Sequence, residues 1–373
     1  MKKVIAAGHI CLDITPVFPA GNRYDSPSSL LVPGRLVQME GAEVHTGGSV
    51  GNTGLALKIL GCDVTLLGKV GDDPLGSMIK SIAAGCGAGG LVTDPESSTS
   101  FTVVLAVPGV DRVFLHNPGA NDTFTGADIP EEALGDAVLF HFGYPPLMRR
   151  FWENGGAELI AMYRRVKGKG IATSLDLAAV DPAAPAGQAD WRGILSGVLP
   201  YVDFFVPSFE ELCWILDRPK FDRLAAAGGN MTEGLNVEAE ALPLAEELLS
   251  MGCRAVVIKC GISGMLLRTA GRERMAGVGP RLGLDPEAWS EKTVLQPAFR
   301  AETVRSATGA GDVSIAAFLT AVLRGKEPEE CLALACAEGA CSVTAYDALS
   351  GLKPLEELER RIRGGWAFEQ RGS

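Results

Sequence analysis

The sequence predicts an α/β fold with a mostly parallel central sheet, and three observations lead to this prediction. Short apolar segments typical of buried strands alternate along the chain with segments of helical spacing, a pattern that indicates βαβ units. Glycine-bearing turns follow several of these strands, at the edge where open parallel sheets bind their ligands. The 373 residues, 47% of them hydrophobic, suffice for a sizeable core, which we expect to be one domain spanning 1–373.

Composition excludes several classes of protein. The formal net charge of -11, without clustered Lys or Arg, argues against a nucleic-acid partner. Nine cysteines without a C-x-x-C pair favour a reducing, cytoplasmic setting, and no 18-residue apolar window predicts a membrane span. The four histidines form no metal-binding pair, so zinc is not indicated.

The N-terminal third predicts a buried strand and a small separate sheet. Residues 4–8 form the strand, and Asp13 follows it as either a turn residue or a ligand contact. A Pro- and Gly-rich loop then precedes a predicted half-buried strand at 36–40. The pattern at 100–116 predicts a hairpin. Strand 36–40 and the hairpin together predict a sheet set apart from the main one.

The rest of the chain continues the alternation of strand and helix. Strands are expected at 137–142, 171–176, 202–207 and 255–259, with a helix at about 159–167. Polar stretches at 221–237 and 271–292 look like inserted loops, and 364–368 looks like a loose tail.

Residues 306–312 (SATGAGD) form a glycine-broken turn that leads into an apolar helix. The free N–H groups at such a helix start bind anions, most obviously phosphate. A carboxylate beside a phosphate site suggests a general base, so Asp312 indicates phosphoryl transfer to a hydroxyl; otherwise it only complements the helix dipole.

Together with residues 46–52 (TGGSVGN), this turn resembles the two signatures of ribokinase-like (PfkB family) carbohydrate kinases. Further matches at 8–13, 67–73 and 257–264 extend the resemblance over nearly the whole chain. It implies a three-layer α/β/α fold with a β-sheet lid from about 14–45 and 99–118.

The resemblance also implies roles for individual residues. Asp312 would be the general base, and the backbone of Gly309, Ala310 and Gly311 would form the anion hole. The implied acceptor contacts are Asp13, Gly47, Gly48 and Asn52. The implied nucleotide contacts are Lys259, Gly261, Gly264 and Thr308, with Glu211 tied to Mg²⁺.

Four further residues leave alternatives open. Arg112 on the hairpin is placed to reach a substrate carboxylate or phosphate, although hairpin arginines are usually solvated, and Asn121 is placed to face the substrate. Ser208 replaces the family's asparagine and fits a helix-capping box equally well. Ser306 replaces an aspartate of the family's monovalent-cation site, so potassium activation is not predicted.

The favoured function is ATP- and Mg²⁺-dependent phosphorylation of a hydroxymethyl group on a sugar-like molecule. A nucleoside kinase of the same fold is the alternative, and the residues do not identify the acceptor. An NAD-dependent oxidoreductase would need a G-x-G-x-x-G after the first strand, which is missing, and a non-catalytic sugar-binding protein would not need Asp312.

The lid strands also predict a homodimer. Apolar residues occupy both faces of 101–107, with Val103 and Leu105 on one side and Val104 on the other. One face covers the sugar site, so a second lid is expected to cover the other.

Overall fold

An eight-stranded sheet forms the centre of the computed structural model, which describes all residues except 1, 20, 22, 25, 109–112 and 370–373. Among the described residues its strand order is β14-β13-β12-β11-β10-β9-β1-β4. The strands from β12 to β4 run parallel, whereas β13 is antiparallel to both of its neighbours, β12 and β14. The bounds are β1 Lys3–Gly8, β4 Asp63–Leu67, β9 Ala137–Gly143, β10 Ala172–Asp176, β11 Phe204–Phe205, β12 Ala255–Lys259, β13 Met265–Thr269 and β14 Thr293–Gln296.

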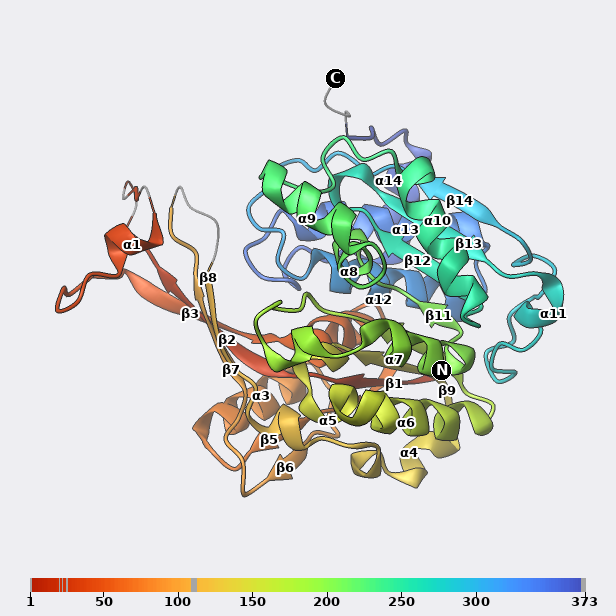
Figure 1. The fold of residues 1–373 in the computed structure, drawn as a ribbon, viewed down its shortest axis with the longest axis horizontal. Coiled ribbons are helices and arrows are strands. Elements are labelled where there is room, and N and C mark those ends of the chain that lie inside the picture. Colours follow the sequence, from red (N-terminus) through yellow and green to blue (C-terminus); the bar gives the residue numbers. More distant parts are fainter. Residues whose placement is uncertain (1, 20, 22, 25, 109–112, 370–373) are drawn as a thin grey trace.

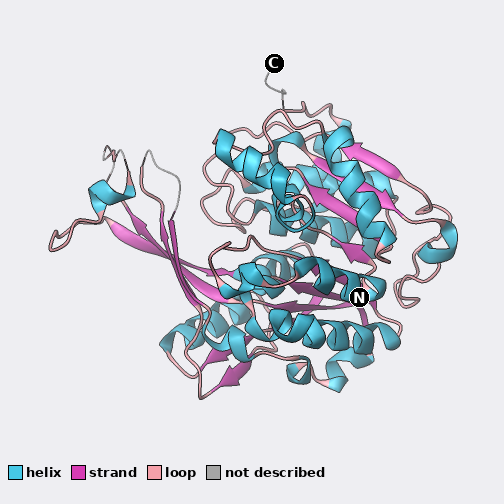
Figure 2. Cartoon of the chain, in the orientation of Figure 1, coloured by secondary structure: helices cyan, strands magenta, loops and turns pink. Residues whose placement is uncertain are grey.

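Helices cover both faces of this sheet, as Figures 1 and 2 show. In the view of Figure 1, α6, α7 and α10 lie in front of the sheet and α12 and α13 behind it. The bounds are α1 Pro27–Leu30, α2 Leu55–Ile59, α3 Pro74–Gly85, α4 Glu131–Gly135, α5 Arg149–Trp152, α6 Ala157–Gly168, α7 Trp191–Val198, α8 Phe209–Leu216, α9 Arg218–Ala227, α10 Val237–Ser250, α11 Arg272–Met275, α12 Ala310–Leu323, α13 Pro328–Ser342 and α14 Leu355–Arg363. The α/β fold with a mostly parallel sheet is therefore confirmed.

The core lies between these layers. Five of the six residues of β1 are buried, because a parallel sheet is covered on both faces and its strands are apolar throughout. Helix α12 is apolar on all sides and buried from Asp312 to Leu323, which is typical of a helix enclosed by its neighbours. Its N-terminus is consequently fixed in position.

A four-stranded sheet, ordered β3-β2-β7-β8, extends from the body on the left of Figure 1. Its bounds are β2 Cys11–Val17, β3 Gly41–Gly47, β7 Phe101–Leu105 and β8 Val113–Asn117, and a separate pair is formed by β5 Lys69–Gly71 and β6 Val92–Asp94. We call the four-stranded sheet the lid. The hairpin prediction is confirmed for β7 and β8.

The predicted lid strand at 36–40 is wrong, since β2 and β3 form the neighbouring pair and 36–40 is irregular. Pro16 argued against a strand here, but β7 pairs with β2 only from Leu12 to Ile14. Pro16 therefore has no partner on the β7 side and is tolerated as at a sheet edge. Asp13 accordingly lies within a lid strand and not in a turn after β1.

Two other expectations need correction. The stretch 221–237 begins inside α9, whose start is capped by the Asp217 carboxylate accepting from the Lys220 N–H. The tail is packed, because Phe368 bridges to Phe299 and the Trp366 ring stacks on Phe299 at 5.0 Å. All nine cysteines are free, seven of them buried, and no described helix is long and apolar enough to cross a membrane.

Candidate active site

The start of α12 provides the predicted anion site. Gly309 precedes the helix with a left-handed φ of 73°, a conformation that favours glycine, and a Cβ there would overlap the methyl group of Ala348. Gly311 lies against Lys259, whose Nζ would be 3.7 Å from a Cβ at that position. A positive side chain and the first-turn N–H groups therefore meet at one point.

Asp312 lies in the first turn of α12 and is only 4% exposed. Asn52 Nδ2 donates to its Oδ2 at 3.0 Å, and Thr53 Oγ1 donates to its Oδ1 at 3.2 Å. Burial raises the pKa of Asp312, against the opposing effects of the Lys259 charge and of these hydrogen bonds. Two sequence motifs about 260 residues apart are thus in direct contact.

The glycine pair before Asn52 lies over the side chains of Asp13, in β2, and of His9, between β1 and β2. A Cβ at Gly47 would overlap the carboxylate of Asp13, and a Cβ at Gly48 would overlap the ring of His9. The chain then enters a π-helix, Val50–Gly54, which carries Asn52. Short π-helical turns occur frequently at functional sites. The turn thus brings Gly47, Gly48, Asp13 and Asn52 together next to Asp312.

Asp13 lies on the lid face that carries Thr102 and His116, as the register of β2, β7 and β8 requires. Its Oδ1 accepts a hydrogen bond from Cys11 Sγ at 3.3 Å. Burial raises the pKa of Asp13, which hydrogen bonds from Cys11 and Thr102 oppose. The carboxylate is therefore part of the inner lid face.

A cavity of about 560 Å³ opens beside the start of α12. Its lining includes Asp312, Gly311, Lys259, Gly261, Gly264 and Glu211. Thr308 lies in the preceding turn, where its N–H donates to Ser306 Oγ at 3.1 Å. Most residues predicted for the nucleotide therefore surround one space.

Lys259 ends β12 and forms a buried ion pair, its Nζ 2.7 Å from Asp176 Oδ1 at the end of β10. Burial raises the pKa of Asp176, which the Lys259 charge opposes, and Oδ2 of Asp176 has no hydrogen-bond partner among the described residues. Sequence analysis missed Asp176. Its place at the carboxyl end of a predicted strand was the available indication.

Tyr144, at the end of β9, was also missed. Its hydroxyl lies 2.9 and 2.8 Å from Oδ1 and Oδ2 of Asp312, and it lines the same cavity. No motif in the sequence indicates this contact, because it depends on how β9 ends.

Glu211 accepts a hydrogen bond from the Ser208 N–H at 2.7 Å, and Ser208 Oγ accepts from the Glu211 N–H at 3.2 Å. The capping-box interpretation is thus confirmed. Within the described part of the chain, no group of three His, Cys, Asp or Glu residues is arranged to hold a metal ion. Glu211 nevertheless faces the cavity.

The two remaining predicted contacts have different outcomes. Asn121 is fully buried in the 3₁₀ turn Gly119–Thr123, where Nδ2 donates to the Ile10 carbonyl at 2.9 Å and Oδ1 accepts from the Ile10 N–H at 3.1 Å. Its amide therefore fixes the connection between β1 and β2. Arg112 lies outside the described residues.

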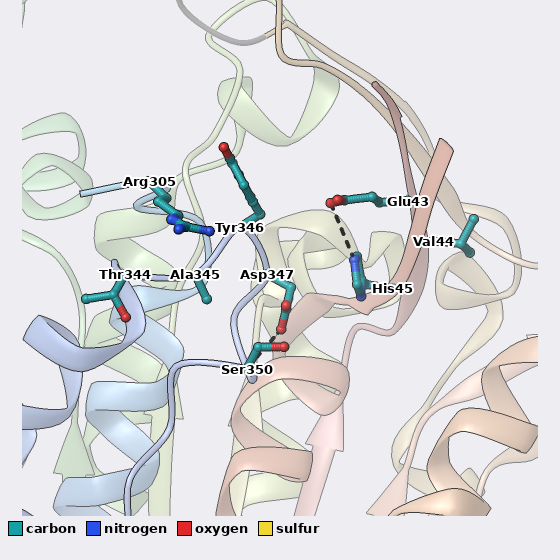
Figure 3. Close-up of a pocket in the computed structure, with 9 residues that line it drawn as sticks. All are labelled: Glu43, Val44, His45, Arg305, Thr344, Ala345, Tyr346, Asp347 and Ser350. Atoms are coloured by element: carbon teal, nitrogen blue, oxygen red, sulfur yellow. Dashed lines mark hydrogen bonds and ion pairs between the residues drawn. The ribbon is translucent and has the colours of Figure 1, made fainter. Parts of the chain in front are cut away.

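A second cavity, of about 400 Å³, lies between β3, the loop before α12 and the loop after α13 (Figure 3). His45 and Glu43 face it from the lid, and Arg305, Tyr346 and Asp347 face it from the body. Both signs of charge are present, so its polarity favours no single ligand class.

Comparison with known proteins identifies carbohydrate kinases as similar in sequence. Residues 3–354 match the model of the pfkB family carbohydrate kinases. The chain is 25% identical to 2-dehydro-3-deoxygalactonokinase of Haloferax volcanii over 97% of both chains. It is 29% identical to fructokinase-2 of Oryza sativa subsp. japonica over 48% of this chain, and the match spans about half (54%) of that relative's length.

Solved structures show the same fold. Ribokinase of Thermotoga maritima gives a TM-score of 0.67 at 20% identity, over 97% of this chain and 99% of that chain. A chain from E. coli, solved in complex with ATP and Mg²⁺, gives 0.70 at 20% identity, over 98% and 100%.

Proposed function

The chain belongs to the pfkB family of carbohydrate kinases, and from this premise we propose that it transfers the γ-phosphoryl group of ATP to a hydroxymethyl group of a sugar-like acceptor. The observation that carries the proposal is the contact of Asp312 with Asn52 and Thr53 at the start of α12. It places a buried carboxylate between an anion site and the glycine turn of the other motif.

Asp312 acts as the general base in this proposal. It takes the proton of the acceptor hydroxyl as the oxygen attacks phosphorus. The N–H groups of Gly309, Ala310, Gly311 and Asp312 stabilise the charge on the transferring group, and Lys259 adds a positive charge beside Gly311.

Asp13 and Asn52 bind acceptor hydroxyls, and Gly47 and Gly48 allow the acceptor to approach the backbone. The inner lid face supports this assignment, because it presents the Asp13 carboxylate beside the glycine turn. Arg112 stays a predicted acceptor contact. Asn121 contributes by holding the backbone that leads to Asp13.

The residues around the 560 Å³ cavity fit ATP and Mg²⁺. Gly261, Gly264 and Gly311 line one side of it, and Lys259 places a positive charge beside Gly311. Thr308 precedes α12, and the Glu211 carboxylate would hold Mg²⁺, directly or through water. ATP would supply the phosphoryl group, and Mg²⁺ would neutralise charge on its phosphates.

A nucleoside is the second candidate acceptor. The rings of His9 and His116 lie 5.2 Å apart, and Tyr144 is 6.2 Å from His9, so aromatic faces for a base lie near Asp13. Sugar acids must also be tested, because the Haloferax relative that aligns over 97% of this chain is a 2-dehydro-3-deoxygalactonokinase.

We further propose that the chain works as one domain and pairs through its lids as a homodimer. Ile14, Val103 and Leu115 share the outer lid face, and Leu115 is 53% exposed. Val104 is buried on the inner face with Asp13, so the face left for a second lid is the one that carries Val103.

ADP formation with a panel of acceptors tests the proposed function. The panel contains fructose, ribose, 2-dehydro-3-deoxygalactonate and adenosine, each with ATP and Mg²⁺. Acceptor-dependent ADP release by the wild type, lost in Asp312→Asn, is the expected result. ADP release that no acceptor stimulates would contradict it.

A further inference from the structure

Tyr144 is held in an unusual backbone conformation next to Asp312. It follows β9 with φ 69° and ψ 39°, the left-handed region that residues with side chains rarely adopt. Buried Pro145 and Pro146 come next, and the Leu147 N–H donates to the Tyr144 carbonyl at 3.0 Å. Strain of this kind is concentrated at functional sites.

The phenol hydroxyl of Tyr144 contacts both oxygens of the Asp312 carboxylate. Its hydroxyl lies at 2.9 and 2.8 Å from the two oxygens of Asp312, so a single proton is shared between them. Asn52 and Thr53 approach the same oxygens from the buried π-helix. Of the three donors, Tyr144 is the one that lines the cavity.

An acceptor hydroxyl must reach the same position. A general base takes a proton from a group within about 2.6–3.2 Å, and the Tyr144 hydroxyl already lies within that range. The phenol does not itself act as a base, because burial and the Asp312 charge raise the pKa of Tyr144. It is therefore a neutral donor on the cavity side of Asp312.

We propose, building on the proposed kinase function, that Tyr144 decides between sugar and water as the phosphoryl acceptor. Without a sugar, the phenol hydroxyl occupies Asp312 and no water molecule is activated there. A bound acceptor contributes enough contacts to displace the phenol, which a single water does not.

The reaction that Tyr144 prevents is ATP hydrolysis. A water oxygen would bond to the γ-phosphorus while the bond from this phosphorus to the bridging oxygen of ADP breaks. The electron pair of that bond leaves with ADP, and the water proton passes to Asp312. The products are ADP and inorganic phosphate, whereas sugar phosphorylation releases ADP without phosphate.

Tyr144→Phe tests the proposal with ATP and Mg²⁺ alone. It removes the hydroxyl and keeps the ring, so acceptor-free phosphate release is expected to rise about tenfold. The apparent KM for an acceptor that the wild type uses should fall, since the acceptor no longer displaces the phenol. A residue that only binds the acceptor would raise that KM when altered.

Tyr201→Phe is the matched control, because its hydroxyl bonds Arg164 Nε at 3.0 Å and does not contact Asp312. If Tyr144→Phe fails to fold, Tyr144→Asn replaces it, since asparagine tolerates the left-handed conformation. Unchanged phosphate release, or a raised acceptor KM, would overturn the proposal. The acceptor panel tests the kinase function, whereas phosphate release is measured without any acceptor. The two proposals can therefore fail independently.

Discussion

Asp312 is the residue on which turnover should depend most. Asp312→Asn is nearly isosteric, so the fold and ATP binding should be retained while kcat falls by about 10² to 10⁴, the usual contribution of a positioned general base. Single-turnover kinetics and calorimetric ATP binding would measure the two effects. Near-normal kcat would contradict the assigned role.

Asp13 should affect the acceptor and not the nucleotide. Asp13→Asn removes the charge on the inner lid face, and the loss of charge-assisted hydrogen bonds should raise the acceptor KM by about 10- to 100-fold. The KM for ATP should change less than twofold. A similar rise in both constants would assign Asp13 a structural role.

At low pH, the activity should be limited by protonation of Asp312. Burial raises the pKa of Asp312, and catalysis needs its ionised form, so kcat/KM should fall as pH drops through a value above the ordinary aspartate range of about 4. The ionisable groups that face it are Lys259, Asp176, Asp13 and Tyr144. An acid limb at or below pH 4 would contradict the prediction.

At the scale of the element, α12 has a left-handed glycine at each end, which gives a matched pair of variants. Gly309 and Gly325 both have φ of 73°, but a Cβ at Gly325 has open space and one at Gly309 would overlap Ala348. Gly325→Ala should cost about 1 kcal/mol from the conformation alone, and Gly309→Ala about 2–3 kcal/mol. Denaturant unfolding measures both, and equal losses would show that the contact with Ala348 is unimportant.

Elements were predictable where composition and local pattern agreed. The strands at 137–142, 171–176 and 255–259 are confirmed, because buried parallel strands are continuous apolar runs. The strand β2 was missed because Pro16 marks a loop in most contexts, and its tolerance depends on where β7 stops pairing. The packed tail was missed since Phe299 lies far from Trp366 in sequence.

At the scale of the whole molecule, the fold class and the pfkB family were both predicted correctly. The meeting of Asn52 with Asp312 could be expected from the resemblance of both motifs to one family. The contact of Tyr144 could not, because it arises from the relative positions of the end of β9 and the start of α12. The only indication for Asp176 was its place at the carboxyl end of β10, and its pairing with Lys259 depends on how the ends of β10 and β12 meet.

The proposed dimer should depend on the outer lid face. Sedimentation at micromolar concentration is expected to give twice the chain mass of 39.1 kDa. Leu115→Asp should shift the chain toward the monomer, because a charge would replace an apolar contact. Leu295→Asp is a control on β14, where Leu295 is 41% exposed away from the lid. A monomeric wild type would contradict the proposal.

Covalent labelling of the nine free thiols can measure which parts of the folded chain open. Burial raises the pKa of thiols such as Cys260 and Cys336, so a thiol-reactive dye should modify them only when the chain opens locally. Cys11 is also buried, but it lies in β2 and bonds Asp13, so its labelling rate should follow motions of the lid. Mass spectrometry of the labelled peptides would separate lid opening from global unfolding within a single unmodified chain.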